Sequence, residues 1–195
     1  MAEAVGQAWY GAFIETVQAH EAAAVLRDAA EAGALRKWTE ALTDVVVGTF
    51  PRLGWGGAAR GHRSDLLPVP REEYLALDVV AFETAGDRRW RFPVAVFELE
   101  NSQDEDRVAY SLWKVLCLRA GLRVVFCYRR DAGEGAELVR HLGDEVVRTM
   151  EIPERAGVGG ETLVVVGSRS ETASFPYGFF KDWALDANTG RFRRS

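Results

Sequence analysis

The 195-residue chain is poor in lysine, cysteine and long apolar runs. Its only lysines are Lys37, Lys114 and Lys181, so the basic side chains are nearly all arginine, and the formal net charge is −5. This balance argues against a generally basic nucleic-acid-binding surface but does not exclude a local one. No run approaches the roughly 20 apolar residues of a membrane span, and the N-terminus lacks the layout of a signal peptide.

The two cysteines, Cys117 and Cys127, lie in apolar stretches without the spacing of metal ligands. We therefore expect buried free thiols, and the sequence supports neither a disulfide nor a zinc site. A hydrophobic content of 48% is ordinary for a globular protein. These features predict a cytoplasmic protein with no membrane partner.

The apolar pattern predicts one α/β domain over residues 1–195, with a central mixed β-sheet flanked by helices. Residues 7–50 form its helical N-terminal part, 70–130 its core, and 134–195 a C-terminal helix with strands. Ser102 and Glu105 have the spacing of a capping box, which predicts a helix from there to about residue 120. Because apolar strands precede and follow this helix, the two strands should be parallel. Both sides of the helix carry apolar residues, so we expect it to lie between layers.

Three acids stand in segments that otherwise have the pattern of buried strands. Asp78 lies near the middle of the apolar segment 74–82, and Glu98 and Glu100 end the apolar segment 92–100. Side chains two residues apart on a strand share a face, so Glu98 and Glu100 should point the same way while Leu99 packs into the core. An unpaired ionised carboxylate in a core is very costly and is normally paired or bound to a metal. The pattern predicts a cation site.

Mg²⁺ binds hard oxygen ligands, usually one or two carboxylates with water and phosphate. The predicted ligands are Asp78, Glu98 and the Leu99 carbonyl, with Mn²⁺ as an alternative ion. Glu21 is a candidate fourth ligand, because its spacing places it on the apolar stripe of the first helix. A helix-edge position or a buried ion pair is the favoured explanation of that spacing. Without a metal, one of the carboxylates should titrate with a raised pKa.

Basic candidates lie on either side of these acids in the sequence. Residues 54–63 form a glycine-rich loop without the spacing of a phosphate-binding loop. Its Arg60, His62 and Arg63 are candidate contacts for a phosphate backbone, and a plain surface loop is the alternative. Lys114 is a candidate catalytic residue on the predicted helix, but the stronger apolar stripe lies elsewhere, which favours a solvent-facing lysine.

The order helix, strand with Asp78, strand with Glu98-Leu99-Glu100, helix and strand resembles the PD-(D/E)XK nuclease superfamily, which has the restriction-endonuclease-like fold. The resemblance covers about residues 21–128. The family signature is an aspartate on one core strand and acid-x-lysine on the next, and here Glu100 stands where the lysine is expected. The resemblance implies that Asp78 and Glu98 bind the metal and that Glu100 orients or deprotonates the attacking water. It also implies that a lysine on the following helix, here Lys114, can replace the strand lysine.

Two functions remain open on this sequence. The first is a Mg²⁺-dependent nuclease that hydrolyses phosphodiester bonds in DNA. The second is a catalytically inactive module of the same fold that binds protein or nucleic acid. The coincidence of three acids favours the first, whereas the acidic net charge and the missing strand lysine favour the second. The acidic charge also suggests that DNA binding depends on a homodimer or on a protein partner.

Overall fold

Seven strands form one mixed sheet in the order β1-β2-β3-β4-β5-β6-β7 in this computed structural model, which describes residues 4–194 without the side chain of His20. The strands are β1 (Trp55–Ala59), β2 (Val79–Glu83), β3 (Ala95–Leu99), β4 (Leu122–Arg129), β5 (Glu161–Ser168), β6 (Phe180–Asp186) and β7 (Arg191–Arg194). Strands β3, β4 and β5 are parallel neighbours, and the other neighbouring pairs are antiparallel. The expected mixed α/β sheet and its parallel crossover are confirmed.

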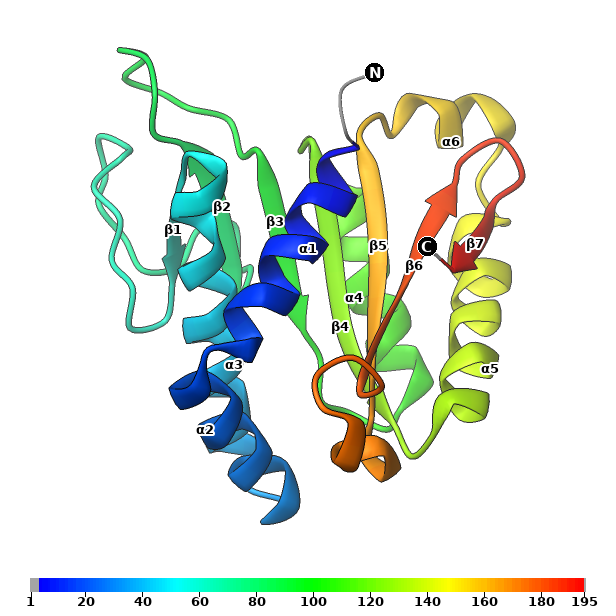
Figure 1. The fold of residues 1–195 in the computed structure, drawn as a ribbon. Helices are drawn as coiled ribbons and strands as arrows, with labels where there is room; N and C mark the ends of the chain where they lie inside the picture. Colours follow the sequence, from blue (N-terminus) through cyan, green and yellow to red (C-terminus); the bar gives the residue numbers. More distant parts are fainter. Residues whose placement is uncertain (1–3, 195) are drawn as a thin grey trace.

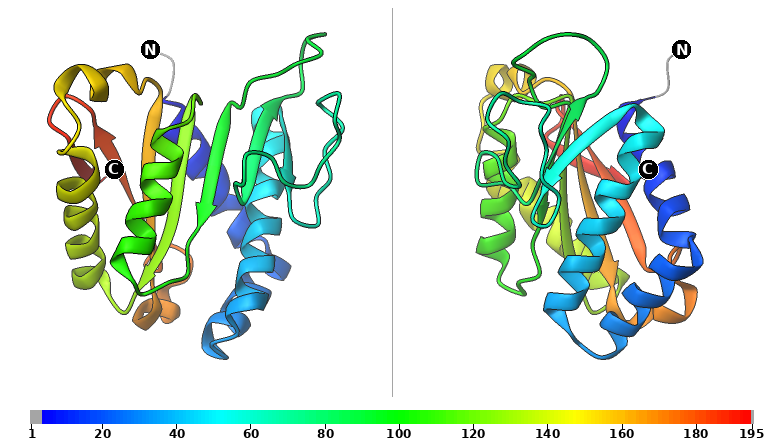
Figure 2. Two further views of the ribbon diagram at one scale, coloured as in Figure 1. Left: turned by 180° about the vertical axis from the view of Figure 1, so that it is seen from behind. Right: turned by 90° about the vertical axis from the view of Figure 1, so that its left-hand side faces the viewer.

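Helices cover both faces of the sheet (Figures 1 and 2). One face carries α1 (Val5–Gln18), α2 (His20–Glu31) and α3 (Leu35–Thr49), and the other carries α4 (Glu105–Leu116) and α5 (Ala132–Leu142). The short helix α6 (Ile152–Gly157) precedes β5. Each face of the sheet therefore has its own hydrophobic core. Within residues 4–194, no helix is long and apolar enough to cross a membrane.

Strand β3 shows how the sequence divides its side chains between these two cores. Ala95, Phe97 and Leu99 belong to the core under α1 and α3, while Val96 belongs to the core under α4. Because side chains alternate along a strand, Glu98 shares the α4 face with Val96. The ladders to β2 and β4 run through Phe97 without a bulge. The prediction that Leu99 packs into the core is confirmed.

The predicted N-terminal helix is two helices, because the backbone leaves the helical region at Ala19 (ψ 126°). The buried stripe of α1 consists of Trp9, Phe13 and Val17, four residues apart and fully buried. Because the helix breaks at Ala19, the buried stripe of α1 does not continue at helical spacing into α2. Val25, which the spacing placed on that stripe, is exposed. The prediction that residues beyond Ala19 continue the stripe was wrong.

The segments that flank the acids also differ from prediction. Residues 54–63 are not entirely a loop, because β1 pairs with β2 along its whole length. Asp78 lies just before β2 rather than in the middle of a strand. Helix α4 begins at Glu105 with Asp104 as its N-cap, since the Asp104 carboxylate accepts the Asp106 N–H at 3.0 Å. The capping box predicted at Ser102 was therefore wrong.

Helix α4 is covered on one side only. Its Val108, Leu112 and Val115 are fully buried against the sheet, but Tyr110 and Trp113 are exposed and stack on each other at 5.8 Å between ring centroids. The expectation that this helix lies between two layers was wrong, because aromatic residues here form an outer surface. The two cysteines are free, as expected, but Cys117 on the same side is exposed.

Candidate functional site

The predicted acids meet at one end of the sheet, where β3 ends and β2 begins. Val79 of β2 pairs with Phe97 of β3, so Asp78 and Glu98 are the next residues along these two antiparallel strands. The Leu99 N–H donates to Asp78 Oδ2 at 2.7 Å, and the Asp78 backbone N–H donates to the Glu98 carboxylate. The sheet register and these hydrogen bonds hold the two carboxylates side by side.

Lys114 reaches these acids from the last turn of α4. Its ammonium Nζ lies 2.7 Å from Glu98 Oε1 and donates to the Ala76 carbonyl at 2.9 Å. The Lys114 side chain is only 22% exposed, so the expectation of a solvent-facing lysine was wrong. A lysine can pass its long aliphatic stem along an apolar surface, so its ammonium need not lie on the face that its Cα position suggests.

The backbone just before Asp78 adopts an unusual conformation. Leu75 and Ala76 both have positive φ, 60° and 54°, although neither is glycine. Such residues cost roughly 1 to 2 kcal/mol each and cluster at sites whose surroundings enforce the strain. Here the conformation accompanies the contact between the Ala76 carbonyl and the Lys114 ammonium. The strained turn therefore belongs to the arrangement of the site.

Burial raises the pKa of both carboxyl groups. Glu98 is 5% exposed, and its desolvation raises its pKa to about 7 against the opposing effect of Lys114, while the nearby charge of Asp78 adds to the rise. The Asp78 residue is largely exposed, yet its carboxyl group is desolvated enough to raise its pKa, against the Leu99 N–H and Lys114. One ammonium thus pairs with Glu98 and only opposes the rise of the Asp78 pKa through its charge, and a further cation would stabilise both ionised forms.

The donor set suits Mg²⁺ better than a metal that is held entirely by protein. Among the side chains described in residues 4–194, no three from His, Cys, Asp and Glu gather as a metal-binding group. Mg²⁺ needs only one or two carboxylates, with water and phosphate oxygens completing its shell. Asp78 and Glu98 fit that requirement by type and by their place on adjacent strands. The Leu99 carbonyl belongs to the same end of β3.

Glu100 lies one residue beyond β3 and shapes the turn that follows. Its backbone N–H donates to the Phe126 carbonyl at 3.0 Å, and its carboxylate accepts the Ser102 N–H at 2.7 Å. Its charge is close enough to Asp78 to contribute to the raised pKa of that group. Glu100 is therefore a neighbour of the acid pair, and its predicted role toward a water molecule stays a prediction.

Glu21 does not belong to this cluster. It is exposed in the first turn of α2, a helix that packs on α1 and α3. These helices cover the sheet face opposite to the one that Glu98 and Lys114 share. The prediction of Glu21 as a fourth ligand was wrong because the helix breaks before it, so the stripe that seemed to include it is interrupted.

The predicted basic residues lie at the same end of the sheet, one strand away. Ala59, the last residue of β1, pairs with Val79, so the turn with Arg60, His62 and Arg63 follows β1 next to the start of β2. Both arginines are exposed. His62 Nε2 lies 2.7 Å from Asp44 Oδ1, so this ring is engaged within the protein. The geometry brings Arg60 and Arg63 near the acid pair and makes His62 a weaker candidate.

One charged residue of this sheet end was not predicted. Arg129 closes β4 and is buried, with its guanidinium donating to the Tyr128 carbonyl at 2.8 Å. It alternates with Val125 and Cys127 and so shares the α4 face with Glu98. The available signal was a charged residue that closes a largely apolar strand, the same signal that identified Glu98 and Glu100.

No family model, curated protein or solved structure matches this chain. The resemblance to PD-(D/E)XK nucleases therefore stays a hypothesis. It makes a specific geometric demand, namely a lysine ammonium beside an aspartate and a second acid on adjacent strands. In this chain Lys114 pairs with Glu98 from a helix, and Asp78 lies just before β2, the strand adjacent to that of Glu98.

Proposed function

We propose that the chain is a metal-dependent nuclease of PD-(D/E)XK type, with a restriction-endonuclease-like fold, that hydrolyses phosphodiester bonds in DNA. The observation that carries the proposal is the position of the Lys114 ammonium, 2.7 Å from Glu98 Oε1, with Asp78 just before the adjacent strand. Lys114 supplies the positive charge that is missing from β3, where Glu100 stands at the position of the signature lysine.

Asp78 and Glu98 are the proposed metal ligands. Two desolvated carboxylates with raised pKa values favour the entry of a cation, because a cation relieves both their mutual repulsion and their desolvation. Mg²⁺ or Mn²⁺ bound there would polarise a phosphate oxygen and lower the pKa of a bound water. The Leu99 N–H holds the Asp78 carboxylate in position. The side chain therefore loses less conformational freedom when a ligand binds.

Lys114 has the donors for a second role. An ammonium carries three N–H donors, and here two of them are directed at Glu98 and the Ala76 carbonyl. The remaining donor would contact a phosphate oxygen or the attacking water, while Glu100 stands close enough to orient that water. Exposed Arg60 and Arg63 at the same sheet end would bind the phosphate backbone on either side of the reaction.

The alternative is a catalytically inactive module that binds a protein or a nucleic acid. Its support is the acidic net charge of −5 and the lack of a preformed three-residue metal group among the described side chains. In this alternative the Lys114–Glu98 ion pair closes the site, and no cation displaces it. The two proposals differ in a single measurable property, which is metal-dependent cleavage.

The test is cleavage of supercoiled and linear DNA by the purified protein with Mg²⁺ or Mn²⁺. We expect the wild type to nick DNA only with a divalent ion, and Asp78→Asn or Glu98→Gln to lose more than about 100-fold of the rate, since even outer partners of metal ligands contribute 10- to 100-fold. Both variants keep the shape of the side chain, so the fold should persist.

Glu21→Gln is the matched control, because it removes an exposed acid far from the site. It should cleave like the wild type. A wild type that cleaves neither DNA nor RNA over a range of salt concentrations would favour the inactive module. A Glu98→Gln variant as active as Glu21→Gln would exclude Glu98 as a ligand.

A further inference from the structure

The segment that joins β2 to β3 projects from the sheet as an arm, which we define as residues 84–94. It leaves the end of the sheet opposite to the acid pair and extends beyond the neighbouring elements (Figures 1 and 2). Residues 83–90 are all exposed, and Trp90 and Phe92 have 62% and 70% of their surfaces in solvent. Large exposed aromatic residues on a projecting segment suggest a contact surface.

The arm is held in shape by one of its own arginines. Arg91 donates to three backbone carbonyls, those of Glu83 at 2.7 Å, Ala85 at 2.6 Å and Gly86 at 2.7 Å. The guanidinium of Arg119 lies 5.5 Å from the centre of the Phe92 ring. These contacts reduce the freedom of the arm before it meets a partner, which lowers the entropic cost of binding.

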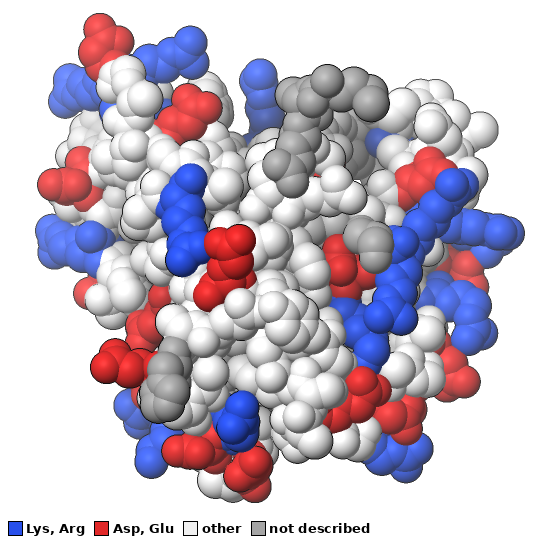
Figure 3. Space-filling model, in the orientation of Figure 1, with Lys and Arg blue, Asp and Glu red and all other residues white. Residues whose placement is uncertain are grey.

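The remaining basic residues of the arm point to an anionic partner. Arg88 and Arg89 are exposed, and no carboxylate in the described part of the chain lies within 4.0 Å of their guanidinium groups. Trp90 follows them directly. Figure 3 shows basic and acidic side chains together on the projecting part at the upper left, where the arm lies in Figure 1. Arginines next to an exposed aromatic ring bind nucleic acid through phosphate contacts and stacking.

We infer that the arm is a second DNA contact, in which Arg88 and Arg89 bind phosphates and Trp90 packs against a deoxyribose. The inference rests on the proposed function for the identity of the partner. Arg88 is ten residues after Asp78, so at about 3.3 Å per residue it lies at most about 33 Å away, which is about one turn of B-DNA. A duplex of about 20 base pairs, about twice that span, is therefore long enough to reach both places, whereas a much shorter duplex has less length with which to span them.

The test is DNA binding without divalent metal, measured by fluorescence anisotropy on duplexes of about 8 and about 20 base pairs, below and above one helical turn. The double variant Arg88→Ala/Arg89→Ala should bind the long duplex about tenfold more weakly, with a salt slope smaller by about 2. Trp90→Ala should weaken the same binding about fivefold, because one aromatic contact is lost. Binding of the short duplex should be weakened less in both variants.

The matched control is Arg27→Ala/Arg36→Ala, which removes two exposed arginines of α2 and α3. It should bind both duplexes like the wild type. Arm variants that bind the long duplex as tightly as the wild type would overturn the inference, as would an equal loss in the control or a wild type that binds no DNA.

Cleavage assays on the same proteins separate the arm from the nuclease proposal. Arm-dependent binding by a wild type that never cleaves would contradict the nuclease and support the arm. Cleavage that is lost in Asp78→Asn, together with arm variants that bind and cleave long DNA normally, would support the nuclease and overturn the arm.

Discussion

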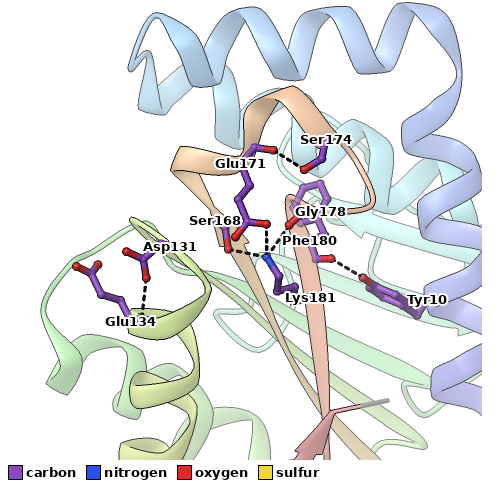
Figure 4. Close-up of polar contacts among 9 residues, drawn as sticks. All are labelled: Tyr10, Asp131, Glu134, Ser168, Glu171, Ser174, Gly178, Phe180 and Lys181. Atoms are coloured by element: carbon purple, nitrogen blue, oxygen red, sulfur yellow. Dashed lines mark hydrogen bonds and ion pairs between the residues drawn. The ribbon is translucent and has the colours of Figure 1, made fainter.

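Two lysines, half-buried Lys114 and buried Lys181, meet carboxylates at the same end of this sheet, and their surroundings differ. Lys181 lies at the start of β6, where its Nζ contacts Glu171 Oε2 at 2.6 Å, Ser168 Oγ at 3.2 Å and the Gly178 carbonyl at 2.6 Å (Figure 4). Lys114 contacts Glu98 and the Ala76 carbonyl. Each lysine is therefore held by one carboxylate and at least one backbone carbonyl.

The difference lies in the balance of charge around each ammonium. At Lys181, three acceptors match the three N–H donors, and one of the acceptors is a carboxylate. At Lys114, two desolvated carboxyl groups, those of Glu98 and Asp78, share one ammonium, and the pKa of each is raised. In the Lys181 cluster every N–H donor of the ammonium has an acceptor, and the cluster links β6 to the segment after β5. The Lys114 cluster is short of positive charge, and so it is the candidate site.

The largest contrast should come from the matched substitutions Lys114→Met and Lys181→Met. Lys114→Met should lower DNA cleavage by about 100-fold, because a group that assists proton transfer or charge neutralisation is removed. Its loss of stability should be the smaller of the two, because Glu98, whose pKa is already raised to about 7, can take up a proton once its partner is gone. Lys181→Met should lower the free energy of unfolding by about 2 to 3 kcal/mol, because it breaks a buried pair.

Cleavage rates at a temperature where both variants are folded, together with urea unfolding curves, measure the two effects. If Lys181→Met removed activity while its fold remained intact, or if Lys114→Met cleaved normally, the assignment of the two clusters would be reversed.

The second contrast concerns pH in the metal-free protein. The pKa of Glu98 is raised to about 7 in the folded chain, from an ordinary value of 4.5. Because the folded state keeps this proton over a range where the unfolded state has lost it, stability should fall as pH rises from about 4.5 to about 7, and then level off. At about 1.4 kcal/mol per pH unit, the fall is on the order of 3 kcal/mol.

Glu98→Gln cannot titrate, so its stability should lack this fall. Urea unfolding at about pH 4.5, 6 and 8 in a chelating buffer compares the two proteins over the interval between the two pKa values. Parallel pH profiles would show that Glu98 is ionised without cost in the folded protein. The raised pKa would then no longer distinguish its cluster from that of Lys181.

The smallest effect should come from the arginines beside the acid pair. Arg60→Ala/Arg63→Ala should weaken DNA binding mainly at low salt and reduce the salt slope by about 2, because each phosphate contact contributes about 0.9. Titrations at several salt concentrations measure that slope. An unchanged slope would show that this turn faces away from the DNA, whichever surface binds it.

The sequence predicted the features that depend on alternation and local spacing. The apolar runs of β3 and β4 identified two buried strands, and the residues between them identified a parallel crossover. The acids at the end of β3 stood out because a carboxylate is rare in such a run. Asp78 and Glu98 therefore came from the sequence, and their adjacency followed from the register of two neighbouring strands.

The remaining features depend on three-dimensional packing. Glu21 was misplaced because no proline or glycine marks the break at Ala19, which lies between Gln18 and His20 in an alanine-rich segment. Lys114 was predicted to face solvent because its Cα lies off the main apolar stripe, whereas the length of its side chain decides where its ammonium lies. The exposed outer face of α4 was missed because aromatic residues have the same pattern whether they meet a second layer or solvent.

The central claim is that Asp78 and Glu98 together bind a divalent cation while Lys114 stays beside them. Isothermal titration calorimetry with Mn²⁺ and Mg²⁺ tests it most directly, on the wild type, Asp78→Asn, Glu98→Gln and the control Glu21→Gln. The account predicts one saturable site in the wild type and in Glu21→Gln, weakened by at least about tenfold in each of the other two variants. Equal binding by all four proteins, or no binding by the wild type, would contradict it.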